Sequence, residues 1–436
     1  MNKKLLLAGL AGILSLATAC KKDDPSPKPT PTPQPGFTIE AKTTDLLQFD
    51  TVRLSAQGAK ADAKLSWVIN GKEVAEGKDY AFTQPRVGRY QVSLVDKTSG
   101  EKVRKDFSVT ARFTSGAFLL NEGNFGNETG TLTYIDASKQ FVLDSAYIRV
   151  NGTKLGNVCQ DMTFANGKVY IISQNGPKNG GEGLLTIADA KTLEKHKVIN
   201  DATLAKDWPT HIAVVHSRIY LRGNSGIYRG TEEGGFKLIP GTEKANKLRM
   251  VTIGELVIAT TSTNKLLVIQ DEEVKQTFTL PEGSPSGLAL APDGQLWLSY
   301  SKPNTLAKVS VSASGVKILD KHTTTQSLDK QWTATSAIFA RANQIFFTEQ
   351  SSVIYRHDFS TGETKEIVDV QKVDKQAKMY YNSLGIDPKT GHIYYASFGD
   401  YSTYKQNVTL VLDHDGKVLL KREHVNAFPA GFYFIP

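Results

Sequence analysis

A net charge of +8 over 436 residues comes from 52 basic and 44 acidic side chains, and no run of Lys or Arg exceeds two residues, which argues against a nucleic-acid partner. Hydrophobic residues make up 40% and charged residues 22% of the chain, an ordinary globular composition that excludes a disordered, collagen-like or polytopic membrane protein. Two Cys are too few for a disulfide framework or a Cys-based zinc site, so burial and strand pairing must hold the fold.

Residues 1–19 have the pattern of an export signal peptide. Lys3 and Lys4 precede an apolar run of about twelve residues, too short to span a bilayer, and small residues then lead to Cys20. This ending resembles the lipobox of bacterial lipoproteins, in which the Cys becomes the first residue and carries acyl chains. The resemblance implies that Cys20 is lipidated and is the only membrane attachment. The alternative is a secreted protein whose signal happens to end in Cys.

Residues 20–36 predict an extended stalk. Six Pro between Pro25 and Pro35 alternate with polar residues, which favours a polyproline II segment of about 30 Å. Lys21-Lys22-Asp23-Asp24, directly after Cys20, resembles the signal by which Bacteroidetes send lipoproteins to the outer face of the outer membrane, although a solvated tether would suit the same residues. We therefore expect a lipid-anchored outer-membrane protein that faces the cell exterior.

Residues 37–112 predict a small antiparallel Ig-like sandwich. Short alternating patterns such as Leu65–Ile69 and Tyr90–Val95 are separated by turn signals such as Asn70-Gly71. The order of Trp67, the turn after it and the later aromatic strands resembles the PKD branch of Ig-like domains. That resemblance implies a spacer or adhesive module, and a lone Trp flanked by strand residues is expected in its core.

Residues 113–436 contain a repeated unit. A strand–turn–strand pattern recurs at steps of roughly 45 residues, as in Met162–Ile172, Ile212–Leu221 and Leu288–Leu298, and a third and usually a fourth strand follow each time. Four-stranded units at this period are typical of a β-propeller.

The two ends of the repeat predict how the ring closes. Gly116–Leu120 matches a second strand with no first strand before it, and Gly431–Ile435 matches a first strand with nothing after it. Pairing them would complete one blade and remove exposed sheet edges. With six whole units, the expected fold is all-β, a small Ig-like sandwich followed by a seven-bladed propeller.

The candidate binding residues lie in the loops of one propeller face, where the inter-blade loops and the loops from second to third strands emerge together. These loops combine Trp, Tyr and Phe with many amides, which suits a flat polar ligand. Alternatively, the aromatic residues wedge between sheets and the Asn residues form turns. The predicted ligand-binding residues are Asn121, Glu122, Phe125, Gln160, Asp161, Asn175, Trp208, His211, Asn224, Tyr300, Trp332, Gln350, Tyr381, Asn382, Phe398, Asp400 and Tyr401.

Catalysis has little support in the sequence. It contains no Gly-x-Ser-x-Gly elbow, no His-Glu-x-x-His pair and no phosphate-binding loop. The His residues are spread along strands and turns, and Cys159 has no cationic neighbour nearby in sequence, so neither predicts a metal site or a reactive thiol. We expect a binding protein rather than an enzyme, without a metal or cofactor.

The order of lipidated Cys, PKD-like module and propeller opening with Leu120-Asn-Glu-Gly-Asn-Phe-Gly126 resembles Bacteroidetes surface lipoproteins built on a propeller of the YncE or surface-layer type. Some members of that group capture cobalamin outside the cell and pass it to a TonB-dependent transporter. The resemblance implies capture of a corrinoid as the function. The alternative is a surface interaction or adhesion protein that binds a glycan, a cell-surface polymer or another protein.

Overall fold

The structure is a computed structural model, and it describes residues 36–330, 335–349, 351–378, 381, 384–425 and 428–436. Cys20, Trp332, Gln350 and Asn382, all named as candidate functional residues, lie outside these ranges. Among the residues described, none of the helices combines the length and the apolar composition that crossing a bilayer would require.

The N-terminal strands form two sheets, as expected for an Ig-like sandwich. One sheet orders β1 (Thr38–Ala41), β3 (Thr51–Gln57) and β6 (Asp79–Thr83). The other orders β2 (Asp45–Leu47), β8 (Lys102–Thr110), β7 (Gly88–Asp96), β4 (Leu65–Ile69) and β5 (Lys72–Glu76), with β2 parallel to β8. Side chains alternate along β3, where Val52 and Leu54 are buried and Thr51 and Arg53 are exposed.

Trp67 lies in the core of this sandwich, as predicted. Its side chain is fully buried, and its indole Nε1 donates a hydrogen bond of 3.0 Å to the carbonyl oxygen of Gly77. The ring also stacks on Tyr80 with 6.0 Å between centroids. A Trp whose indole is buried and whose N–H is hydrogen-bonded has a structural role, so Trp67 does not indicate a ligand site.

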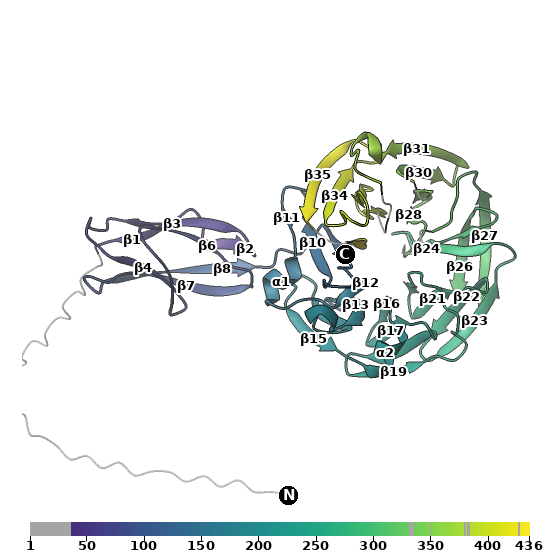
Figure 1. The fold of residues 1–436 in the computed structure, drawn as a ribbon, viewed down its shortest axis with the longest axis horizontal. Coiled ribbons are helices and arrows are strands. Elements are labelled where there is room, and N and C mark those ends of the chain that lie inside the picture. Colours follow the sequence, from purple (N-terminus) through teal and green to yellow (C-terminus); the bar gives the residue numbers. More distant parts are fainter. Residues whose placement is uncertain (1–35, 331–334, 350, 379–380, 382–383, 426–427) are drawn as a thin grey trace, which may run out of the picture. The chain divides into compact units, whose positions relative to one another are not determined.

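The later strands form seven four-stranded sheets within the described residues, and Figure 1 shows them set around a common axis as a β-propeller. Blade 1 draws on both ends of this part: β36 (Pro429–Phe434), β9 (Ala117–Asn121), β10 (Thr131–Ile135) and β11 (Val142–Leu143). Blade 2 has β12 (Asn157–Ala165), β13 (Lys168–Gly176), β14 (Leu185–Asp189) and β15 (Lys195–Ile199). Blade 3 has β16 (His211–Val215), β17 (Arg218–Arg222), β18 (Ile227–Thr231) and β19 (Gly234–Leu238).

The remaining blades follow the same order from the axis outward. Blade 4 has β20 (Val251–Ile253), β21 (Leu256–Thr260), β22 (Lys265–Gln270) and β23 (Glu273–Thr279), and blade 5 has β24 (Ser284–Leu290), β25 (Leu296–Ser301), β26 (Thr305–Ser312) and β27 (Gly315–Thr323). Blade 6 has β28 (Phe339–Arg341), β29 (Gln344–Phe347), β30 (Val353–Asp358) and β31 (Glu363–Asp369), and blade 7 has β32 (Leu384–Ile386), β33 (Ile393–Phe398), β34 (Gln406–Leu412) and β35 (Val418–Val425). Short helices α1 (Ala146–Asn151), α2 (Ala202–Asp207), η1 (Lys178–Gly180) and η2 (Val370–Lys372) lie between strands.

The predicted closure of the ring is confirmed. Strand β36 pairs antiparallel with β9, so that Phe432 lies opposite Leu119 and Tyr433 opposite Phe118. Beyond the strand, the amide of Ile435 donates a hydrogen bond of 3.0 Å to the carbonyl oxygen of Gly116. The C-terminal segment therefore supplies the innermost strand of the first blade, and this blade has no open inner edge.

Apolar side chains of neighbouring blades pack together to form the core. Between blades 7 and 1, Tyr394 packs edge-on against Phe432, with 5.5 Å between ring centroids. Gly385 in β32 permits this approach, because a Cβ atom added there would lie 2.6 Å from the Cβ of Phe432. Burial of such side chains drives association of the sheets.

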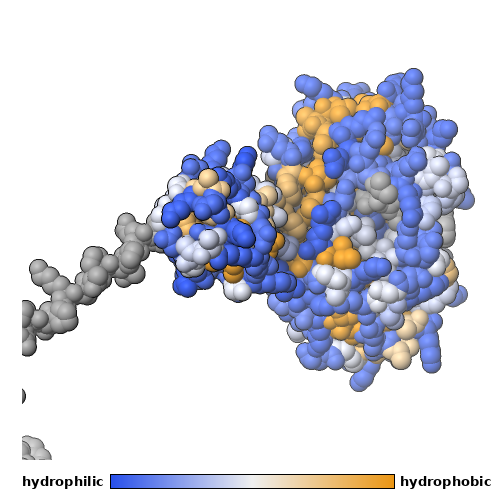
Figure 2. All heavy atoms as spheres, turned by 60° about the vertical axis from the view of Figure 1, so that its left-hand side comes forward, coloured by the Kyte–Doolittle hydropathy of each residue, from blue (hydrophilic) through white to orange (hydrophobic). Residues whose placement is uncertain are grey.

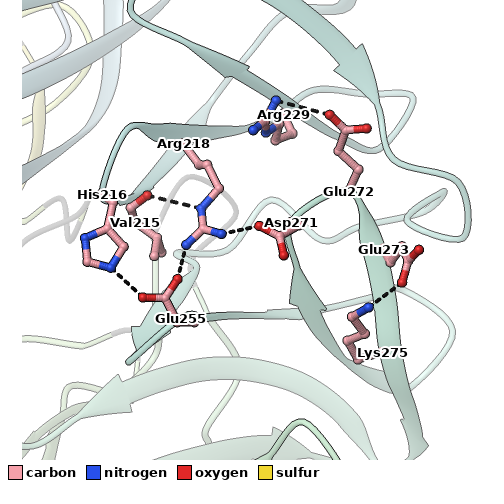
Figure 3. Close-up of polar contacts among 9 residues, drawn as sticks. All are labelled: Val215, His216, Arg218, Arg229, Glu255, Asp271, Glu272, Glu273 and Lys275. Atoms are coloured by element: carbon pink, nitrogen blue, oxygen red, sulfur yellow. Dashed lines mark hydrogen bonds and ion pairs between the residues drawn. The ribbon is translucent and has the colours of Figure 1, made fainter.

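Ion pairs join blade 3 to blade 4. Figure 3 shows Arg218 of β17 reaching both Glu255 and Asp271 of blade 4, while His216 also contacts Glu255. Nearby, Arg229 pairs with Glu272 at 3.1 Å. Partly exposed pairs of this kind add little stability each, so the network mainly fixes how blade 3 sits against blade 4.

Charged and polar side chains cover much of the face drawn in Figure 2, and apolar residues gather in smaller areas.

Candidate functional site

Loops from five blades enclose one pocket of about 570 Å³, which we call the aromatic pocket. The lining residues lie in inter-blade loops, in loops from a second to a third strand, or in the parts of strands nearest to such loops. This is the face on which the sequence predicts the binding residues. The lining residues are Glu122, Gly123, Phe125, Val158, Gln160, Gln174, Trp208, Thr210, Arg222, Asn224, Lys247, Tyr381, Tyr401 and Phe428.

Glu122 is the buried acidic group of this pocket. It follows β9 directly, and only 5% of its surface is exposed. Its Oε1 accepts a hydrogen bond of 2.7 Å from Gln160 Nε2, and its Oε2 accepts one of 2.8 Å from the Tyr381 hydroxyl. Burial raises the pKa of Glu122 to about 7, against the opposing effects of the Lys247 charge and these two hydrogen bonds. The carboxyl group therefore changes charge near neutral pH.

Basic side chains near the pocket oppose the negative charge that Glu122 carries when it is ionised. Arg222 ends β17, and Lys247 lies in the inter-blade loop before β20. Burial lowers the pKa of Lys247, as does the charge of Arg222, whereas Glu122 raises it. Burial, and then the charges of Lys247 and Arg222, lower the pKa of Lys330 to about 8. Three cations thus share one end of the propeller with Glu122.

Aromatic rings supply the apolar surface of the pocket. Phe125 and Trp208 lie with their ring centroids 6.4 Å apart and remain 51% and 47% exposed. On the blade 7 and blade 1 side, Phe428 packs against Tyr381 at 5.5 Å and against Tyr401 at 5.8 Å. Exposed rings of this size are typical of binding surfaces, because each offers a large apolar area with few rotatable bonds.

Two lining residues have strained backbones. Val158 has φ 57°, which is unfavourable for a β-branched residue, and it lies at a bulge where the register of β12 shifts. Trp208 has φ 53° at the end of α2, where the side chain of the preceding Asp207 accepts hydrogen bonds from Ser225. Strained residues cluster at functional sites, where the surrounding structure holds them in place.

Seven of the predicted binding residues line the aromatic pocket. They are Glu122, Phe125, Gln160, Trp208, Asn224, Tyr381 and Tyr401. Phe398 lies just behind the lining, because its ring packs 5.3 Å from Phe428 while its own side chain is buried.

The structure places other predicted residues in structural roles instead. Asp161 is buried and accepts hydrogen bonds of 2.6 Å from the Tyr433 hydroxyl and 3.2 Å from the amide of Ile212. Burial raises the pKa of Asp161, and Arg249, 3.5 Å away, opposes this effect. Asp161 therefore ties the innermost strands of blades 1, 2 and 3 together.

His211 is also fully buried. Its Nδ1 lies 2.9 Å from the hydroxyl of Thr210. Burial, and then four nearby cations led by Lys247, lower the pKa of His211 well below its usual range, so the imidazole stays neutral.

The last four predicted positions serve turns or the core. Asn121 donates to Thr131 Oγ1 at 3.3 Å, and Asn175 donates to Asn157 Oδ1 at 2.7 Å. Asp400 accepts from the backbone amides of Ser402 and Thr403 in a tight turn. Tyr300 is fully buried in blade 5. None of the four lines the aromatic pocket.

Sequence reasoning missed the basic residues of the pocket. Lys247 lies in an inter-blade loop that carries no aromatic residue, so a pattern of aromatic and amide residues does not include it. Arg222 sits one position before the Gly223-Asn224 loop and belongs to the strand rather than to the loop. The signal that could have found both is the presence of basic residues flanking the loops of this face.

A second cavity, of about 350 Å³, is lined mainly by the innermost strands of several blades. Arg249 and Tyr433 belong to its lining, and both already contact Asp161. Across the described part of the chain, no group of three or more His, Cys, Asp or Glu side chains is arranged to hold a metal ion. The aromatic pocket remains the better candidate site.

The fold and the pocket define a seven-bladed β-propeller with a ligand-sized pocket on its loop face. The chain belongs to the family described as "Domain of unknown function (DUF5074)", whose model matches residues 115–435. A second model, described as "Penicillin-Binding Protein C-terminus Family", matches residues 27–104. No curated protein matches the chain in sequence.

Solved structures resemble the chain in fold. A quinonprotein alcohol dehydrogenase-like protein (BT1487) from Bacteroides thetaiotaomicron is 16% identical, with a TM-score of 0.60 over 92% of this chain and 100% of that one. A protein from Lactobacillus plantarum is 11% identical, with a TM-score of 0.50 over 74% of this chain and 100% of that one. The family match and these likenesses fit the predicted propeller, while the Bacteroidetes origin, the lipid anchor and the corrinoid ligand stay predictions.

Proposed function

We propose that this protein captures an organic ligand in the aromatic pocket and does not transform it. The observation that carries the proposal is the combination, in one pocket of about 570 Å³, of exposed rings with buried polar groups. Pockets that bind small molecules have this size and this mixture of apolar walls and a few placed polar groups. The strained Val158 and Trp208 backbones add support, because such strain is kept where function needs it.

Binding is favoured over catalysis by the hydrogen bonds of Glu122. A pKa near 7 would suit a general acid or base, yet both carboxyl oxygens already accept hydrogen bonds from Gln160 and Tyr381. Cys159 is buried and free, and burial raises the pKa of its thiol, so it is a poor nucleophile. We infer that Glu122 shapes and polarises the pocket.

We further propose that the protein works outside the cell, anchored through Cys20 and the Pro-rich stalk. In this setting a corrinoid, passed to a TonB-dependent transporter, is the first ligand to test. The rings could cover its flat face, and the amides of Gln160, Gln174 and Asn224 could bind its polar rim. A corrinoid exceeds a drug-sized molecule, so part of it would project from the pocket.

The test is calorimetry of the purified protein with cyanocobalamin, haem and soluble glycans. Trp208→Ala is expected to weaken binding by about 2 kcal/mol, roughly thirtyfold, without lowering the melting temperature, because the indole is half exposed. Phe125→Ala should act in the same direction. Leu319→Ala, at a similarly exposed side chain of blade 5, serves as the matched control.

The outcomes separate the alternatives. Corrinoid binding that Trp208→Ala weakens supports the proposal. Glycan binding with no response to cyanocobalamin would instead favour the adhesion function. Binding that survives both ring substitutions would place the site on another surface, and a chemically altered ligand after incubation would overturn the non-catalytic proposal.

A further inference from the structure

The charges around the aromatic pocket are not balanced. Arg222 and Lys247 line it, and Lys330 lies close enough to both for their charges to lower its pKa. Among the lining residues, Glu122 is the acidic one. Asp207, whose charge acts on Arg222, already accepts hydrogen bonds from the amide and the hydroxyl of Ser225. Among the residues that line the pocket, two are cationic and one is acidic, so the lining carries a net positive charge.

The Lys247 ammonium is held near the pocket without a bonded acceptor. Within the described ranges it forms no hydrogen bond or ion pair, and Glu122 acts on it only through the longer-range charge. Each Glu122 oxygen accepts one hydrogen bond, from Gln160 or from Tyr381, and neither accepts one from Lys247. A half-buried ammonium in this position gains by meeting an anion, since hydrogen bonds between charged groups are about twice as strong as neutral ones.

Arg222 is fixed beside it. Its Nε donates a hydrogen bond of 3.1 Å to the carbonyl oxygen of Ala245, and its Nη1 makes only long contacts of 3.4 Å to Thr210 Oγ1 and Asn224 Oδ1. The Nε bond orients the guanidinium, and the weak Nη1 contacts can be exchanged for better acceptors. A planar guanidinium held in this manner suits a carboxylate or a phosphate.

We propose that the pocket selects an anionic amphipathic ligand, whose carboxylate or phosphate group is bound by Lys247 and Arg222 while its planar apolar part packs on Phe125 and Trp208. This inference rests on the proposed function of the same pocket. The charges of the lining residues assign the chemical class of the ligand, and an ionised Glu122 repels the anionic group of that ligand.

The probes are two dyes that share an arylaminonaphthalene body. 1-Anilinonaphthalene-8-sulfonate is an anion, and N-phenyl-1-naphthylamine is neutral. Fluorescence titration of the full protein should show at least tenfold tighter binding of the anionic dye. Lys247→Gln should weaken binding of the anion about tenfold and leave the neutral dye unchanged, whereas Trp208→Ala should weaken both.

Two further variants sharpen the test. Glu122→Gln removes the opposing charge and should strengthen binding of the anion severalfold at pH 8, the reverse of the Lys247→Gln effect. Lys237→Gln, at an exposed position of β19, is the matched control and should change neither titration. Should Lys247→Gln fail to fold, raising the salt concentration must still weaken the anion and spare the neutral dye.

Competition identifies the acidic group. Benzoate or phenyl phosphate should displace the anionic dye, and benzamide should not; the stronger competitor distinguishes a carboxylate ligand from a phosphate ligand. Equal binding of both dyes, unaffected by Lys247→Gln, would overturn the anionic class while leaving the pocket as a binding site. Dye binding that Trp208→Ala leaves unchanged would instead refute the proposed function itself.

Discussion

The hydroxyl of Tyr381 donates a hydrogen bond of 2.8 Å to Glu122 Oε2, although the two residues are 259 positions apart. Tyr381 precedes blade 7 and Glu122 follows the second strand of blade 1, while Gln160 of blade 2 binds the other carboxyl oxygen. Glu122 therefore links three consecutive blades at the rim of the aromatic pocket. The shape of the site depends on these contacts across the closing point of the ring.

Tyr381→Phe removes one of these contacts without changing the size of the ring. Glu122 Oε2 then loses the hydrogen bond from Tyr381, and a buried acceptor left without a partner costs about 1–3 kcal/mol. The same change should raise the pKa of Glu122 further, because that hydrogen bond favours the ionised form. Urea unfolding at pH 8 measures the loss. Tyr401→Phe, at a half-exposed ring of the same pocket, is the control, and an equal loss in both variants would contradict the assigned role.

Glu122 also predicts how stability depends on pH. Its pKa is about 7 in the folded protein and near 4.5 when exposed, so the folded state binds a proton more tightly than the unfolded state. Its contribution is therefore most favourable below pH 4.5, decreases as the pH rises to 7, and stays constant above. At 1.36 kcal/mol per pKa unit, the total change is about 3 kcal/mol at most.

The Glu122→Gln variant lacks this titration. Relative to the natural protein, its unfolding free energy should rise between pH 4.5 and 7 and then level off. Chemical unfolding of both proteins at several pH values checks the curve. A difference that does not change with pH would mean that the pKa of Glu122 is the same in the folded and unfolded protein, and would contradict the raised value.

The propeller could be predicted because its signals are local and repeated. Each unit places apolar residues on consecutive strands around a short turn, and the unmatched strands Gly116–Leu120 and Gly431–Ile435 are enough to predict the closure that β36 and β9 make. The side chains that face a common pocket are harder to infer. Asp161 and Gln160 are adjacent, yet one binds Tyr433 inside the fold and the other lines the pocket with Glu122.

The charged residues of the site are also hard to predict from the sequence. Arg222 ends a strand and Lys247 lies 25 positions later, and the sequence places each of them in or beside a loop of the same face but does not bring them into one pocket. Their proximity arises from the packing of blade 3 against blade 4 and from the Arg222 contact with Ala245. Composition indicates the aromatic half of the site, whereas the cationic half depends on how the blades pack.

The proposed anchor leads to a prediction in cells. Mature protein with Cys20 should enter the detergent phase, and protease added to intact cells should remove it. Cys20→Ser should release the protein from the membrane, and changing Asp23 and Asp24 to Ala should protect it from protease by retaining it inside. Full protection of the natural protein would contradict display on the cell surface.

The last prediction tests the closing strand. Deletion of Ala430 to Pro436 removes most of β36, exposes the edge of β9, and uncovers the buried faces of Leu119 and Tyr394. The loss should amount to several kcal/mol, a large part of the 5–15 kcal/mol that stabilises a typical domain.

Phe432→Ala provides a milder version of the same test. The ring is 3% exposed and packs against Tyr394, so its removal should cost about 3–5 kcal/mol. Leu419→Ala, at an exposed position of β35, is the control and should change stability by less than about 0.5 kcal/mol. Thermal and urea unfolding measure all three proteins. If the deleted protein melted within a degree or two of its parent, β36 would contribute nothing to the ring, because an open first blade would then be as stable as a closed one.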